Sequence, residues 1–146
     1  MRKFLAAFPV LMLLASPQAH AITQAEAEKI AANYLASLPP AEVSYDAIKT
    51  VIGDLDGDGK PEIVVQTALL GPTYWSYQLD VFVDRGKGYA HAGTGELWGD
   101  VQSIAIDKGM VVVKSKMPAP NDPRCCPTLE KTYRYAWKGG KVIEAK

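Results

Sequence analysis

Residues 53–65 read GDLDGDGKPEIVV. Asp-Gly pairs of this kind make tight turns, because glycine accepts the left-handed backbone that other residues resist. After Pro61 the segment changes to the run Glu62-Ile-Val-Val, whose β-branched residues are typical of a strand. The segment therefore predicts an acidic loop that joins two antiparallel strands.

Acidic residues alternate along this loop. Asp54, Asp56, Asp58 and Glu62 occupy positions 1, 3, 5 and 9, and Lys60 at position 7 can offer its backbone carbonyl. Carboxylates this close repel one another unless a cation neutralises them, and Ca²⁺ is bound by oxygen ligands in this alternating arrangement. The spacing favours a calcium site with these five residues as ligands. An acidic, solvated hairpin turn without a metal is the alternative.

The loop is not an EF-hand, because its position 12 is Val65 and the residues around it have strand character. The order DxDGDG, a proline, an acidic residue and a β-branched run resembles the calcium loop of FG-GAP and VCBS repeats, which joins two antiparallel strands. This resemblance implies a Ca²⁺ ion bound by residues 54–62. The motif occurs once, so a complete β-propeller is excluded.

One helix is expected before the acidic loop. Thr23-Gln-Ala-Glu26 is a capping box, and the helix continues to about Ser37 before Pro39 and Pro40 end it. The residues that recur at helical spacing and are expected to face the core are Ile30, Tyr34, Leu35 and Leu38.

Short apolar runs separated by turn signals predict strands after the helix. They cover residues 47–52, 62–69, 75–83, a strand that begins at Tyr89, and residues 101–107, 110–116, 129–137 and 141–144. The resulting fold class is α+β, with one N-terminal helix packed on a mostly antiparallel sheet of about seven strands.

The N-terminus has the three parts of a secretory signal peptide. Basic residues at positions 2 and 3 precede an apolar stretch at 4–14, and the segment ends in Ala-His-Ala at 19–21. The apolar stretch is too short to span a bilayer. We therefore expect a signal peptide at 1–21 and a periplasmic or secreted protein without a membrane span.

The remaining residues 22–146 suit a single domain with one core. In the whole chain, 16 Lys and Arg residues balance 16 Asp and Glu residues, and no basic stripe stands out. Nucleic acid is therefore not expected as a partner.

The two cysteines, Cys125 and Cys126, are neighbours between Pro123-Arg and Pro127. In an oxidising compartment they can form a vicinal disulfide that stiffens a loop. Free buried thiols, a redox-active pair and an intermolecular bridge are the alternatives.

The order of these features resembles small bacterial envelope proteins of the LppP/LprE type. It consists of an export signal, a capped helix, an acidic loop between strands, the segment Asp-Pro-Arg-Cys-Cys-Pro, and a final hairpin with Tyr-Arg-Tyr-Ala-Trp. The chain departs from that type because no lipidated cysteine follows the signal. The resemblance implies an envelope location and no particular activity.

No set of residues indicates catalysis. His91 is the only histidine after the signal peptide, and no nucleophile motif accompanies it. The sequence therefore predicts no catalytic residue and favours a non-enzymatic binding or envelope-associated protein. A small envelope hydrolase is an alternative, as is an inhibitor or immunity-type protein that acts on a cell-wall enzyme.

Aromatic residues are the candidates for ligand contacts, because Tyr and Trp dominate such contacts. Alternation along 75–83 places Trp75 and Tyr77 in the core and Ser76, Gln78 and Asp80 on the opposite, polar face of the strand. Tyr74, Phe82 and Trp98 are left as outward aromatics. Tyr74 and Trp98 are the predicted ligand-binding residues. The predicted partner is a glycan or an envelope protein.

Overall fold

The computed structural model describes residues 21–146, so the predicted signal peptide lies outside the described residues except for Ala21. One helix is followed by eight strands in this part of the chain. The elements are α1 (Gln24–Ser37), β1 (Ser44–Gly53), β2 (Glu62–Leu70), β3 (Trp75–Asp84), β4 (Tyr89–Leu97), β5 (Asp100–Asp107), β6 (Met110–Met117), β7 (Leu129–Lys138) and β8 (Lys141–Ala145).

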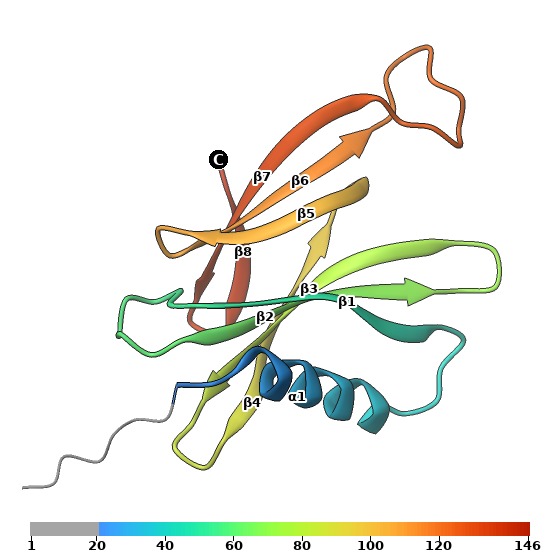
Figure 1. Ribbon diagram of the computed structural model, residues 1–146. Coiled ribbons are helices and arrows are strands. Elements are labelled where there is room, and N and C mark those ends of the chain that lie inside the picture. Colours follow the sequence, from blue (N-terminus) through green and yellow to red (C-terminus); the bar gives the residue numbers. More distant parts are fainter. Residues whose placement is uncertain (1–20) are drawn as a thin grey trace, which may run out of the picture.

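The strands form two antiparallel sheets of four, and each sheet is a meander of consecutive strands (Figure 1). Sheet 1 has the order β1-β2-β3-β4, and sheet 2 has the order β5-β6-β7-β8. The sheets also meet at their rims, where β1 contacts β5 and β4 contacts β8. The predicted α+β class is confirmed. The strands expected in one sheet are divided between two.

Helix α1 covers the outer face of sheet 1 (Figure 1). Ala27 and Ala31 are fully buried there and let the helix approach the sheet closely, against Ile63, Val65 and Phe82. Burying each of the larger side chains, Ile63, Val65 and Phe82, contributes about 1.5 to 3 kcal/mol. The helix is therefore held mainly by packing, since isolated helices of this length are marginal in water.

The start of the helix is capped as the sequence predicted. The Thr23 backbone N–H donates to Glu26 Oε2 at 2.8 Å, and the Glu26 backbone N–H donates to Thr23 Oγ1 at 3.3 Å. Of the expected core residues, Ile30 and Tyr34 pack against the buried cluster. Leu35 and Leu38 are only half-buried, because they lie on the last turn of the helix and beyond it.

The main core lies between the two sheets. Val64 of β2 and Leu79 and Val81 of β3 face Val111 and Val113 of β6. Alternate residues of β2 and β3 thus face sheet 2, while the others face the helix. Both faces of these central strands are buried, which explains the nearly continuous apolar run of β2.

Within the described residues, no helix has the length and apolar character needed to cross a lipid bilayer.

Candidate functional site

The acidic loop connects β1 to β2, where Gly53 pairs with Glu62. Gly57 and Gly59 have φ angles of 80° and 81°, a left-handed backbone in which a side chain would be strained. Leu55 anchors the loop, because its side chain is buried in the core between the sheets. The chain therefore turns sharply at Gly57 and Gly59, directly after the buried Leu55.

Hydrogen bonds from backbone N–H groups turn the carboxylates inward. Asp54 accepts from Gly57 at 2.6 Å through Oδ1 and from Gly59 at 2.9 Å through Oδ2. Asp56 Oδ1 accepts from the N–H of Asp58 at 3.0 Å. The next carboxylate repeats this pattern, since Asp58 Oδ1 accepts from the Lys60 N–H at 2.7 Å. Asp56 and Asp58 each keep a second oxygen that has no partner in the described part of the chain.

The three aspartates form an acidic triad, defined as Asp54, Asp56 and Asp58. One carboxylate oxygen from each lies within 4.8 Å of the others, a spacing that one metal ion can bridge. Asp56 and Asp58 are exposed and Asp54 is half-buried, so the triad opens to solvent. Like charges at such distances repel, and a cation would remove that repulsion.

Glu62 lies behind the acidic triad. Its side chain is only 3% exposed, and Oε2 accepts a hydrogen bond from the Leu55 N–H at 2.6 Å. Burial raises the pKa of the Glu62 carboxyl, and the charges of the triad raise it further. Glu62 also lines an open cavity of about 520 Å³ together with Asp56, Asp58 and Lys60. The acidic triad thus contains three of the five predicted ligands. The other two, Lys60 and Glu62, lie beside it.

Position 12 of the loop cannot supply a ligand. Val65 is in the middle of β2 and is buried beneath the helix, where it belongs to the cluster around Phe82. The strand character expected for this segment is confirmed.

Sequence reasoning missed a buried polar network around Asp80. It assigned Asp80 to the polar face of a strand, but the helix covers that face and the side chain is 1% exposed. Asp80 accepts hydrogen bonds from Thr67 at 2.7 Å and Gln78 at 2.9 Å through Oδ2. Its Oδ1 meets His91 Nε2 and the Thr94 hydroxyl, both at 2.9 Å. The alternation along β3 shows that Asp80 and Gln78 share one face of the strand. It does not show that helix α1 covers that face.

This network does not have the geometry of a Ser-His-Asp device. Asp80 Oδ1 and Thr94 Oγ1 both contact the same ring nitrogen of His91, at 2.9 and 3.1 Å. In a triad the carboxylate and the nucleophile contact different ring nitrogens, so that the proton can pass between them. His91 instead stacks on Tyr34 of α1, with ring centroids 4.5 Å apart. The arrangement links the helix to sheet 1.

The outward aromatics are only partly those expected. Tyr74 and Trp98 are exposed, but the prediction was wrong for Trp75, which is 69% exposed, and for Phe82, which is buried. The buried part of β3 begins at Leu79, because its first residues extend beyond the region where the two sheets cover each other. Phe82 faces α1. Tyr74 covers the β2–β3 turn, and Trp98 lies between β4 and β5.

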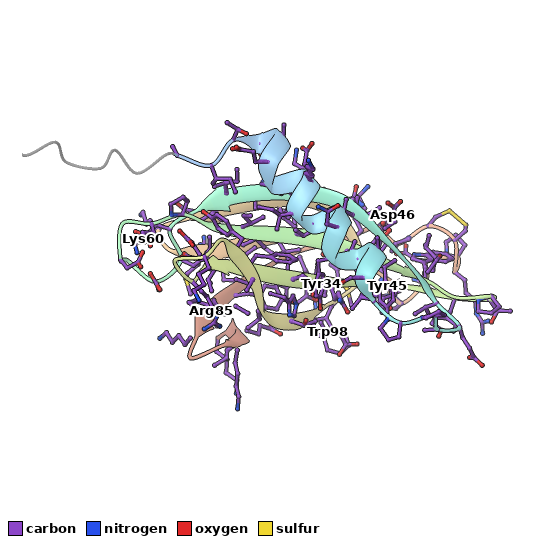
Figure 2. The ribbon with its side chains drawn as sticks, turned by 90° about the horizontal axis from the view of Figure 1, so that it is seen from below. Tyr34, Tyr45, Asp46, Lys60, Arg85 and Trp98 are labelled. Carbon is purple, nitrogen blue, oxygen red and sulfur yellow. A yellow bond between two sulfur atoms is a disulfide. The ribbon has the colours of Figure 1, made fainter. Side chains whose placement is uncertain are left out.

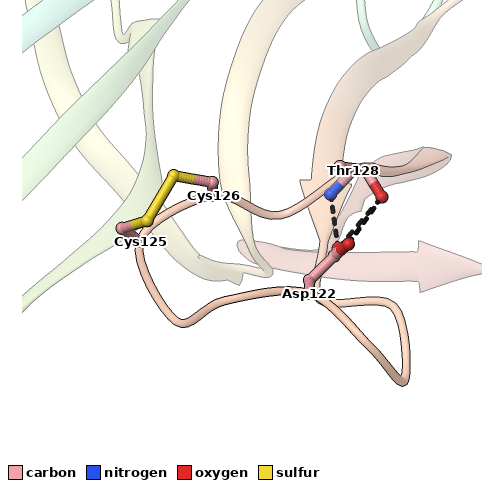
Figure 3. Close-up of a disulfide and its surroundings, with 4 residues drawn as sticks. All are labelled: Asp122, Cys125, Cys126 and Thr128. Atoms are coloured by element: carbon pink, nitrogen blue, oxygen red, sulfur yellow. Dashed lines mark hydrogen bonds between the residues drawn. A yellow bond between two sulfur atoms is a disulfide. The ribbon is translucent and has the colours of Figure 1, made fainter.

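The cysteines are joined to each other in a vicinal disulfide, with Cα atoms 3.8 Å apart (Figure 3). Asp122 fastens the same loop, since its Oδ2 accepts from the N–H groups of Ala119 and Thr128, each at 2.7 Å. The hydrogen bond from Ala119 is the main cause that lowers the pKa of Asp122, and the bonds from Thr128 add to it. The predicted pairing is confirmed.

The acidic triad and the disulfide loop lie at opposite ends of the molecule (Figures 1 and 2). In Figure 2, Lys60 of the acidic loop is on the left and the disulfide is at the far right. No protein-family model matches this chain, and a search of curated proteins finds no match either. The likeness to FG-GAP and VCBS loops therefore rests on residues 53–65 and stays a prediction.

Proposed function

We propose that this protein is an exported calcium-binding module with a non-enzymatic role in the bacterial envelope or outside the cell. The observation that carries the proposal is the acidic triad, whose oxygens converge within 4.8 Å on a loop shaped by backbone hydrogen bonds. All its ligand atoms are hard oxygens, which suit Ca²⁺ or Mg²⁺ better than Zn²⁺ or copper.

Calcium is preferred over magnesium because of the shape of the site. Mg²⁺ demands near-ideal octahedral geometry and gives up its water reluctantly, whereas Ca²⁺ accepts irregular sets of six to eight oxygens. The exposed triad leaves room for water molecules, and Glu62 and the Lys60 carbonyl are close by in the loop. An irregular ligand set completed by water fits Ca²⁺.

The role of the ion is to order the β1–β2 connection. Without the position-12 ligand, the dissociation constant is expected at about 10⁻⁴ to 10⁻³ M, as in extracellular modules. At a concentration ten times the dissociation constant, binding adds about 1.4 kcal/mol to stability. That is enough to hold a loop, and it matches calcium levels outside the cytoplasm.

Export is supported by two features. The N-terminal residues have the composition of a secretory signal, and the adjacent cysteines are paired, which is typical of oxidising compartments. A periplasmic or secreted location is therefore part of the proposal.

Isothermal titration calorimetry with CaCl₂ tests the calcium site. The wild-type protein, made without residues 1–21, is expected to bind one Ca²⁺, and Asp56→Asn is expected to lose that binding. Asp46→Asn is the matched control, because Asp46 is exposed on β1 and belongs to no cluster of metal ligands in the described residues. Absence of binding by the wild type at 10 mM, or full binding by Asp56→Asn, would overturn the proposal.

A further inference from the structure

An open groove of about 580 Å³ lies at the end of the molecule that carries the disulfide, within the range of roughly 300 to 1,000 Å³ typical of small-molecule sites. Four segments form it: the start of β3, the β4–β5 connection, the end of β6 and the loop 118–128. Figure 1 shows the β2–β3 hairpin and this loop on the right, away from the acidic loop on the left. We call this feature the aromatic groove.

Two indole rings make the groove unusual. Trp75 is 69% exposed and Trp98 is 46% exposed, and both line the groove. Burying an exposed aromatic side chain would contribute about 25 cal/mol of free energy for each Å² of apolar surface removed from water. Clusters of exposed apolar surface mark sites of interaction more often than accidents of packing.

Charges of both signs accompany the indoles. Glu96 and Asp100 supply acceptors, and Lys116 and Arg124 supply donors. In the part of the chain that the structure describes, none of the four forms a salt bridge. The groove therefore offers hydrogen-bonding groups of both kinds with no net charge. It matches an uncharged ligand that donates and accepts hydrogen bonds and has flat apolar faces.

The wall formed by loop 118–128 is built before any ligand arrives. The disulfide ring closes Cys125 onto Cys126, and the Cys126 N–H donates to the Pro123 carbonyl at 3.0 Å. Asp122 holds the two ends of the loop through Ala119 and Thr128. A wall that is already ordered costs less entropy on binding.

A peptide bound as an added strand fits the groove poorly. From Tyr77 onward β3 lies between β2 and β4, whereas Trp75 and Ser76 pair with β2 alone. Strand addition needs a free sheet edge, and at β3 that edge is only these two residues long. Recognition in the groove is therefore assigned to side chains.

We propose that the aromatic groove binds an uncharged oligosaccharide. Trp75 and Trp98 stack on the C–H faces of sugar rings, and the four charged side chains bond the hydroxyl groups, each of which both donates and accepts. The disulfide ring forms a rigid side of the site. This names a ligand class for the non-enzymatic role proposed above and does not depend on the calcium loop.

Calorimetric and fluorescence titrations with cellotetraose, maltotetraose and chitotetraose, on the protein without residues 1–21, test the proposal. At least one of these neutral sugars is expected to bind. Trp75→Ala and Trp98→Ala are expected to weaken that binding about tenfold to thirtyfold each. The matched control is Ile143→Ala, because Ile143 is an exposed large apolar residue of β8 outside the groove and its loss should leave affinity unchanged. Circular dichroism verifies that each variant is folded.

Several outcomes would overturn the proposal. They are no binding of any of the three sugars at 10 mM, binding that survives Trp75→Ala combined with Trp98→Ala, and stronger binding of polygalacturonate or a peptide library than of neutral sugars. Repeating the titration in EDTA and with Asp56→Asn separates the two sites, since sugar binding should persist when calcium binding is lost.

Discussion

The two ends of the molecule are built in different ways. At the acidic end, the carboxylates and the backbone N–H groups that orient them lie in one stretch of nine residues. At the other end, the aromatic groove draws on four segments that are distant in the sequence. A site of the first kind is visible as a motif. A site of the second kind exists only once the chain has folded.

The largest expected effect comes from removing Asp80, whose hydrogen-bond network lies in sheet 1 between the two ends. Asp80→Ala leaves the fully buried Thr67 hydroxyl without its partner and breaks the contacts to His91 and Thr94, and should lower the free energy of unfolding by about 3 kcal/mol or more. Urea denaturation measures this loss. Asp46→Ala, at an exposed position of β1, should change it by no more than about 0.5 kcal/mol. Equal stability of the two variants would contradict the account of the Asp80 network.

The next largest effect tests whether calcium binding at the acidic triad is independent of the aromatic groove. Saturating calcium should stabilise the wild type by about 1.4 kcal/mol at ten times the dissociation constant, a rise of several degrees in melting temperature. Asp56→Asn should abolish that rise without changing sugar affinity at the aromatic groove. Differential scanning calorimetry with CaCl₂ or EDTA measures it. A calcium-dependent rise that Asp56→Asn retains would place the ion elsewhere.

A smaller effect concerns the core between the ends. The Tyr135 hydroxyl is buried without a hydrogen-bond partner among the described residues, and burial raises its pKa to about 12. Tyr135→Phe removes a polar atom that cost free energy to bury, so stability should stay equal or rise by up to about 1 kcal/mol. Chemical denaturation measures the change. A clear loss would show that the hydroxyl is bonded after all, for example to water.

The smallest effect is local to the disulfide loop. Because hydrogen bonds from Ala119 and Thr128 lower the pKa of Asp122 below its ordinary value of 3.8, the folded state binds its proton less readily than the unfolded state. The stabilisation is therefore complete above pH 3.8 and is lost as the pH falls through the lowered value. Hydrogen exchange at the Thr128 amide should accelerate, relative to neighbouring amides, over that window. Asp122→Asn should remove this pH dependence, and an unchanged pH profile in that variant would rule out Asp122 as its cause.

Local patterns predicted much of the fold. The capping box set the start of α1, and turn residues and alternation located the strands to within a few residues. The same patterns misplaced Trp75, Phe82 and Asp80. Period-two alternation tells which residues share a face of a strand, but it does not tell what covers that face. In β3 both faces are covered, one by α1 and the other by sheet 2, and the cover stops before Trp75.

The site residues also differ in how far the sequence could predict them. The carboxylates of the acidic triad were predictable because their spacing along the chain determines their spacing in space. Glu62 was expected as an equal ligand, yet it is drawn inward by the Leu55 N–H, which no spacing rule reveals. Trp98 was predicted to be outward, but its neighbours in the groove come from β3, β6 and loop 118–128.

Each sheet is a meander of consecutive strands, so the chain passes from sheet 1 to sheet 2 only once, between Leu97 and Asp100. Every strand pairs with its immediate neighbour in the sequence, and such short-range pairings form quickly. Assembly can thus follow synthesis, with the first meander complete before the second emerges. A chain threaded through a translocation pore, N-terminus first, would deliver all the strands of sheet 1 before those of sheet 2.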